Sequence, residues 1–167
     1  FTVAHEIGHL LLHKSSCVSM LCSAQDLVNY SSSGLEAEAN EFAAELLMPT
    51  ELFKSRCDVT RPSMTHVRSL AERFETSLTA TGLRFVECTP EPCAVTYSEA
   101  KRIKWWRKND AFAFSLRSSE ALSPDSYAFD VASGRPVEDR MQLTDGAAWS
   151  DSSRAEDVDL HEHSIAL

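Results

Sequence analysis

The run His5-Glu6-Ile7-Gly8-His9 restricts the fold of this chain more than any other feature, because the H-E-x-x-H pattern is a metal-binding pattern of helices. Residues four positions apart lie on one face of a helix, so both imidazoles can reach a single divalent ion. Apolar residues flank the run, and burying these polar side chains would be costly without a partner such as a metal. Gly8 costs the helix about 1 kcal/mol relative to Ala and therefore favours a place where another segment approaches the backbone closely.

The two histidines are candidate metal ligands, and the glutamate between them is the candidate general base. A zinc ion held by three protein ligands keeps one position for water and lowers the pKa of that water to about 7. Glu6 follows His5 directly and is placed beside such an ion, where its carboxylate can take the proton of the water. We expect Zn2+ as the cofactor, with Mn2+ or Fe2+ as alternatives. The competing interpretation is an ordinary amphipathic helix that carries the pattern by chance.

A second helix is predicted over residues 35–48, because strong helix formers fill this segment and Pro49 follows it. Its apolar residues form one stripe that packs on a core: Leu35, Ala39, Phe42, Ala43, Leu46 and Leu47. Glu36 and Asn40, one turn apart, lie on a different line. We predict that Glu36 is the third metal ligand and that Asn40 hydrogen-bonds a ligand histidine.

Other polar residues have a weaker claim on the metal. Glu38, Glu41 and Glu45 are expected on a solvated face of the second helix. His13 continues the four-residue series of histidines, but a straight helix turns by about 80° over eight residues, which moves it off the metal-facing line. We assign His13 to packing or to a contact with a ligand, and keep it as the alternative third ligand. Tyr30 and the histidines are candidates to stabilise the oxyanion, with no geometric reason to choose among them.

The two motifs carry a family resemblance. Residues 5–13, with the H-E-x-x-H helix, and residues 36–49, with the sequence E-A-E-A-N-E-F-A-A-E-L-L-M-P, resemble the ImmA/IrrE family of metallopeptidases. Residues 69–81 resemble the helix-turn-helix-like segment that follows the peptidase core in that family. Residues 87–106 resemble the start of its C-terminal region.

The resemblance implies a zincin-like peptidase in which His5, His9 and Glu36 hold the metal and Glu6 is the catalytic carboxylate. It implies a site-specific endopeptidase whose protein substrate is a helix-turn-helix (XRE-type) transcriptional repressor. Cleavage would relieve repression of stress-response or mobile-element genes. The resemblance also implies a GAF-like sensory unit in the C-terminal half, for which we predict no small-molecule ligand.

The fold class expected from these patterns is α+β, in three parts. Residues 1–58 form the metallopeptidase core, residues 59–88 a helix-turn-helix-like segment, and residues 89–167 a β-rich unit. The chain starts without Met only four residues before the first motif. We therefore expect it to be truncated, with an upstream sheet against which the metal-binding helix packs.

Changes of hydrophobic period predict the elements of the second and third parts. Helices are expected over residues 66–74 and 78–86, with Thr60 as N-cap and Pro62 at the helix start. Alternating apolar residues predict strands over residues 94–97, 102–107 and 112–116.

Further along, the third part gives weaker signals. Strict alternation puts Ile103 and Trp105 on the core face, with Trp106 on the opposite face. Residues 144–156 are rich in Ser, Asp and Ala, and we expect a flexible connection there. His161-Glu162-His163 is expected to be a polar tail rather than a site.

Charge separates the chain into three blocks and suggests an alternative function. The net charge is −6 over residues 1–52, +5 over residues 53–108 and −8 over residues 109–167, which gives −9 in total. The basic block holds the helix-turn-helix-like pair, so a non-catalytic DNA-binding or sensory regulator is the alternative. The acidic flanks would repel a phosphate backbone, and we expect no direct DNA binding.

Cysteine usage points to a reducing compartment. The cysteines, Cys17, Cys22, Cys57, Cys88 and Cys93, form an odd set without a C-x-x-C pair. We expect a cytoplasmic protein without a membrane segment or leader. Cys88 and Cys93 flank a turn, and we expect ordinary small apolar residues there, with a disulfide or metal site as the alternative.

Overall fold

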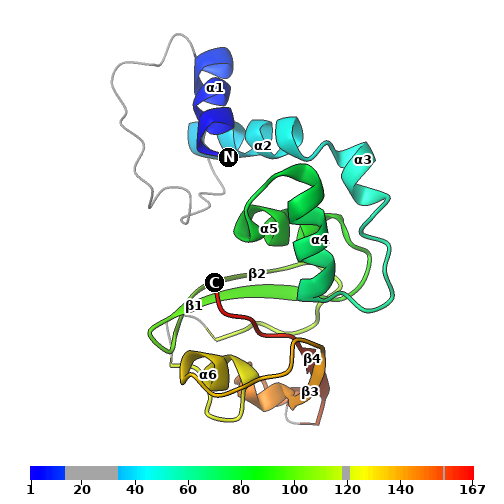
Figure 1. Cartoon of the computed structure of the whole chain (residues 1–167), viewed down its shortest axis with the longest axis vertical. Helices are drawn as coiled ribbons and strands as arrows, with labels where there is room; N and C mark the ends of the chain where they lie inside the picture. Colours follow the sequence, from blue (N-terminus) through cyan, green and yellow to red (C-terminus); the bar gives the residue numbers. More distant parts are fainter. Residues whose placement is uncertain (14–33, 118–120, 156) are drawn as a thin grey trace.

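The computed structural model describes residues 1–13, 34–117, 121–155 and 157–167, and its fold is α+β as expected. The helices are α1 (Thr2–Leu12), α2 (Leu35–Leu47), α3 (Thr50–Lys54), α4 (Met64–Phe74), α5 (Leu78–Cys88), α6 (Tyr127–Ala132) and the 3-10 helix η1 (Gly146–Ala148). The strands are β1 (Ala94–Glu99), β2 (Arg102–Lys108), β3 (Gln142–Asp145) and β4 (Asp159–Glu162). Figure 1 shows the β1–β2 hairpin between α4 and α5 on one side and α6, β3 and β4 on the other. None of the described helices has the length and hydropathy needed to cross a membrane.

Helices α1 and α2 pack closely because small residues line their contact. Ala39 and Ala43 of α2 have no exposed surface. A methyl group at Gly8 of α1 would lie only 3.1 Å from the Cα atom of Ala39. The close approach expected at the glycine is thus confirmed, and it places the polar lines of the two helices side by side. Helix α2 ends just before Pro49, as predicted.

The first hydrophobic core joins the end of α2 to α3, α4 and α5. Its buried members are Met48, Phe53, Cys57, Val67, Leu70, Phe85 and Cys88. Side chains from both sides of the expected boundary at residue 58 share this core. The end of the segment expected as the peptidase core and the helices α4 and α5 therefore share one hydrophobic core.

Helices α4 and α5 cover the predicted ranges 66–74 and 78–86, and each helix is two residues longer than predicted. Helix α4 begins after Ser63, so the expected N-cap Thr60 and helix start Pro62 are wrong by a few residues. Helix α5 begins after Ser77, whose hydroxyl accepts a hydrogen bond from the backbone N–H of Ala80 at 3.2 Å. This bond satisfies one of the donors that the first turn of a helix leaves free.

A bulge changes which residues of the hairpin face the core. Strands β1 and β2 are antiparallel, and their register shifts after Tyr97 so that Lys104 is left as an extra residue. Trp105 stacks on Tyr97, with 5.7 Å between the ring centroids. Ile103 and Trp106 instead join the second hydrophobic core. The expectation that Ile103 and Trp105 share one face is wrong, because the bulge reverses the alternation between them.

The second core lies among the hairpin, α6 and the β3–β4 pair. Its buried members are Ile103, Leu116, Leu122, Ala148 and Trp149. The strand expected over residues 112–116 forms no ladder among the described residues. Phe112 and Phe114 instead make an edge-to-face contact at 5.9 Å, and Leu116 enters the core. The apolar alternation there reflects packing rather than strand pairing.

The end of the chain is not a polar tail. Glu162 lies in β4, antiparallel to β3, and is 8% exposed. Its carboxylate accepts hydrogen bonds from the indole N–H of Trp149 at 2.9 Å and from the backbone N–H of Ala128 at 2.6 Å. The segment expected to be flexible holds the end of β3, helix η1 and the buried Ala155. The Ser164 hydroxyl donates a third hydrogen bond to Glu162 at 2.8 Å, so this buried carboxylate has the partners that offset its desolvation.

One exposed carboxylate links the C-terminal unit to the helical pair. Asp139 lies 3.1 Å from the Arg68 guanidinium of α4 and 2.8 Å from Nε2 of His163. The hydrogen bonds from His163 and Arg68 hold the pKa of Asp139 below its ordinary value. The link lies at the surface and contributes little to stability by itself.

Candidate metal centre

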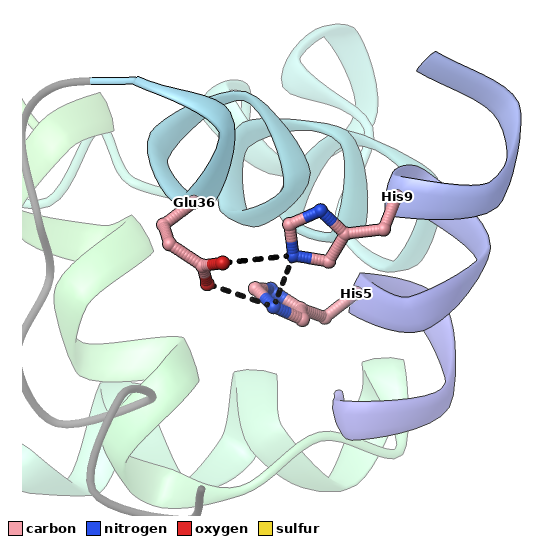
Figure 2. Close-up of side chains that lie close together, drawn as sticks. All are labelled: His5, His9 and Glu36. Atoms are coloured by element: carbon pink, nitrogen blue, oxygen red, sulfur yellow. Dashed lines mark hydrogen bonds and ion pairs between the residues drawn. The ribbon is translucent and has the colours of Figure 1, made fainter. Parts of the chain in front are cut away.

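Three side chains from α1 and α2 converge on one point. His5 and His9 come from α1 and Glu36 comes from the first turn of α2, and Figure 2 shows all three directed toward one another. The Nε2 atoms of the two histidines are 3.1 Å apart. The Glu36 carboxylate oxygens lie 3.3 Å from Nε2 of His5 and 3.2 Å from Nε2 of His9. Among the described residues, this is the one cluster of His, Cys, Asp or Glu with the spacing of a metal site.

The distances within the cluster fit a metal ion. Ligand atoms about 2.0–2.1 Å from a tetrahedral zinc ion lie about 3.3–3.4 Å from one another, which is close to the observed separations. Two imidazole nitrogens and one carboxylate also form the donor set of many catalytic zinc sites. The three predicted ligands thus have both the chemistry and the spacing to hold Zn2+, Mn2+ or Fe2+.

Asn40 fixes the tautomer of the first histidine. Its Oδ1 atom lies 2.9 Å from Nδ1 of His5, as the sequence predicts, and it is one turn of α2 beyond Glu36. An amide oxygen accepts, so Nδ1 carries the hydrogen and Nε2 keeps its lone pair for a metal. Asn40 is 1% exposed and His5 2% exposed, so water does not compete for this bond.

A second chain of hydrogen bonds orients the other histidine. Nδ1 of His9 lies 3.2 Å from Nδ1 of His13, and Nε2 of His13 lies 2.8 Å from a carboxylate oxygen of Glu38. The carboxylate accepts from Nε2–H of His13, which leaves Nδ1 of His13 to accept from Nδ1–H of His9. Nε2 of His9 then keeps its lone pair, as in His5. His13 therefore contacts the candidate ligand His9 and does not belong to the cluster of His5, His9 and Glu36.

Glu38 is a partner of His13 that its sequence pattern does not predict. Its side chain is 62% exposed, in line with the solvated face expected for it, yet its carboxylate binds the buried His13. The sequence signal for His13 is its i, i+4 spacing from His9, which places it one turn beyond His9 at the C-cap of α1. Nothing in the spacing of α2 alone separates Glu38 from Glu41.

Glu6 occupies an exposed position of α1 next to His5. Exposure suits a group that must meet a substrate and water, whereas the candidate ligand His5 beside it is buried. The assignment of Glu6 as general base stays a prediction. Tyr30, one candidate for stabilising the oxyanion, lies outside the described residues.

Arg84 connects α5 to the helix that carries Glu36. Its guanidinium donates to the backbone carbonyl of Met48 at 3.2 Å, to the Thr50 hydroxyl at 2.8 Å and to the carboxylate of Glu45. Hydrogen bonds from Thr50 and from Arg84 hold the pKa of Glu45 below its ordinary value. The Arg84 side chain is only 11% exposed, and its charge faces the C-terminal end of α2. The sequence places Glu45 on the solvated face of α2 and gives no signal for its partner Arg84.

One comparison with known proteins identifies a family for the part of the chain that contains the cluster. The family model described as the IrrE N-terminal-like domain, Peptidase_M78, matches residues 1–85, a range that contains α1 to α4 and most of α5. No curated protein matches the chain. The matched domain suggests a metallopeptidase-type function. Because the match covers half of the sequence and includes the whole His5, His9 and Glu36 cluster, the chain belongs to the ImmA/IrrE family through its IrrE N-terminal-like domain.

Proposed function

We propose that this protein is a metal-dependent endopeptidase whose metal is held by His5, His9 and Glu36. One observation carries the proposal: the outer hydrogen bond of each histidine puts the ring hydrogen on Nδ1, and both Nε2 atoms face the Glu36 carboxylate. Such preset tautomers are typical of metal ligands, since the outer bond orients the ring and raises its basicity. The family match supports peptidase chemistry at this site.

The chain's own residues account for the proton transfers of peptide hydrolysis. A metal ion bound there supplies Lewis-acid activation of water and of the scissile carbonyl. Glu6 takes a proton from the attacking water and later delivers it to the leaving amine, which is the role of a general base that becomes a general acid. Asn40 and His13 keep the two ligand imidazoles in place during these steps.

We further propose a zincin-like core that acts on a helix-turn-helix (XRE-type) repressor in the cytoplasm, with a role in stress response or mobile-element regulation. Membership of the ImmA/IrrE family supports this substrate class. The β-rich part after residue 88 is proposed as a GAF-like sensory unit. A non-catalytic regulator that uses α4 and α5 on DNA is the alternative, but several apolar residues of this pair are occupied by the first core.

Metal content and cleavage, measured together, test the proposal. The purified protein is analysed for bound metal and then incubated with an XRE-type repressor, with and without a chelator. We expect cleavage that the chelator abolishes. Stoichiometric metal without cleavage of any such repressor would support the non-catalytic alternative, and absence of metal binding would refute the site itself.

Two variants separate the roles of the carboxylates. Glu6→Gln should retain metal and lose cleavage, because it removes the base without removing a ligand. Glu36→Ala should lose metal, whereas the matched control Glu41→Ala on the same helix should keep both metal and cleavage. Cleavage retained by Glu6→Gln would exclude Glu6 as the base, and equal metal loss in Glu36→Ala and Glu41→Ala would exclude Glu36 as a ligand.

A further inference from the structure

A pocket of about 300 Å3 adjoins the candidate metal centre, between α5 on one side and α2 and the start of α1 on the other. Figure 1 shows the N-terminal end of α1 and the helix α2 beside α5. This volume is at the lower end of the range for ligand pockets, so the pocket has room for a short segment of peptide. Residues from all three helices line it, among them Thr2, Asn40, Ala44, Thr79, Ala80 and Leu83.

The pocket continues the line of side chains that forms the metal cluster. On α2, Glu36, Asn40 and Ala44 follow one another at intervals of four residues. On α1, Thr2 lies three residues before His5. The pocket therefore begins one helical turn, about 5.4 Å, from the cluster. An extended peptide rises about 3.4 Å per residue, so a peptide whose scissile bond lies at the cluster reaches the pocket within about two residues.

Asn40 has a hydrogen-bond donor that its contact with His5 leaves unused. Its Oδ1 atom accepts from Nδ1–H of His5 at 2.9 Å. Its Nδ2 atom is buried and has no hydrogen-bond partner among the described residues. A carboxylate at this position would accept from His5 equally well and would bring no donor that needs a partner. The contact with His5 therefore does not explain why the side chain is an amide.

We propose that this pocket is a subsite for the peptide substrate, and that Nδ2 of Asn40 donates to a main-chain carbonyl oxygen of that substrate. The inference rests on the proposed peptidase function, because it places the pocket beside the reacting bond. The length of the pocket favours an extended segment as its occupant. Thr79, Leu83 and Glu87 line it at intervals of one turn of α5, over about 12 Å. This length corresponds to about three or four extended residues.

Replacing Asn40 by aspartate separates its two roles. Asn40→Asp keeps an oxygen that accepts from His5 and removes the unpartnered donor. The probe is a fluorescein-labelled XRE-type repressor, and its Kd is measured by fluorescence anisotropy with the Zn2+-loaded full chain that carries Glu6→Gln to prevent cleavage. We expect Asn40→Asp in this background to bind the repressor about 2–10-fold more weakly, as for the loss of one hydrogen bond. Its affinity for Zn2+, measured by competition with a chelator, should stay close to that of the parent. An unchanged Kd for the repressor would overturn the proposal and would assign Nδ2 to a bound water.

A second variant fills the pocket from the side opposite the metal centre. Thr79→Trp places an indole in the pocket from α5. Thr65→Trp is the matched control, because Thr65 is exposed, is not among the residues that line the pocket and is likewise the second residue of its helix. We expect Thr79→Trp to weaken repressor binding more than Asn40→Asp does, and Thr65→Trp to leave it unchanged. Equal Kd values for the two tryptophan variants would refute the pocket as a substrate subsite.

The outcomes separate this proposal from the peptidase function. Cleavage by the unsubstituted protein with a KM that neither Asn40→Asp nor Thr79→Trp changes would refute the subsite and leave the peptidase function standing. Binding that both variants weaken, without cleavage by the unsubstituted protein, would support the pocket as the binding site for the repressor and refute the peptidase function. Absence of repressor binding to the Glu6→Gln protein would refute the subsite for this class of substrate.

Discussion

Replacing Asn40 tests whether the outer hydrogen bond sets metal affinity. In Asn40→Ala the Nδ1–H group of His5 loses its acceptor, 2.9 Å away, in a place that water does not reach. Loss of an outer partner of a ligand histidine typically weakens metal affinity by about 10–100-fold, which corresponds to about 1.4–2.8 kcal/mol. A buried donor left without a partner costs about 1–3 kcal/mol, so the two estimates agree.

The assay is competition for Zn2+ with a chromogenic chelator, which gives the Kd of each variant. Asn40→Asp keeps an oxygen acceptor toward His5 and should retain most of the affinity. Glu41→Ala, an exposed change on the same helix, is the control for general effects on α2. The thermal unfolding of the metal-free proteins is recorded in parallel, to separate weaker binding from lost structure. A Kd for Asn40→Ala that equals the wild-type value would refute the positioning role of this bond.

Two further changes test the hydrogen bond between His9 and His13 and the close packing of α1 on α2 at Gly8. His13→Ala should weaken Zn2+ binding by about 10-fold or more, because His9 loses the acceptor that Glu38 holds in place; unchanged affinity in the chelator competition would show that His9 orients itself. Gly8→Ala should lower the free energy of unfolding by about 1–3 kcal/mol, since the new methyl group would lie 3.1–3.2 Å from backbone atoms of Ala39. Urea unfolding measures this loss, and an equally stable variant would show that α1 and α2 can separate without cost.

The sequence predicts that His5, His9 and Glu36 converge because the spacing within each helix is local. His5 and His9 lie one helical turn apart, and Glu36 and Asn40 repeat this spacing on a second helix. Each pair fixes its own geometry once a helix forms. The approach of the two helices also leaves a local mark, in the form of Gly8 opposite Ala39.

Contacts between distant segments were missed because no periodicity records them. The hydrogen bond between His13 and Glu38 joins residues 25 positions apart, and the Arg84 contact with Met48 spans 36. The expected exposure of Glu38 does not predict its contact with His13, since a mostly solvated carboxylate can still bind a buried partner. The prediction of which hairpin residues face the core is wrong for a different reason. A bulge adds one residue to β2 and thereby reverses the faces that strict alternation assigns.

Arg84 joins α5 to the end of α2, and its replacement should therefore lower the stability of the protein. Its guanidinium donates to the backbone carbonyl of Met48 at 3.2 Å and to the Thr50 hydroxyl at 2.8 Å. Arg84→Met should lower the Tm, because acceptors in a place where Met48 is only 1% exposed lose their donor. Arg84→Lys keeps the charge but not the fork of donors, so it should also lower the Tm, by less than Arg84→Met. Thermal unfolding measures both changes, and a Tm for Arg84→Met equal to that of the wild type would show that these hydrogen bonds do not hold α5 to the end of α2.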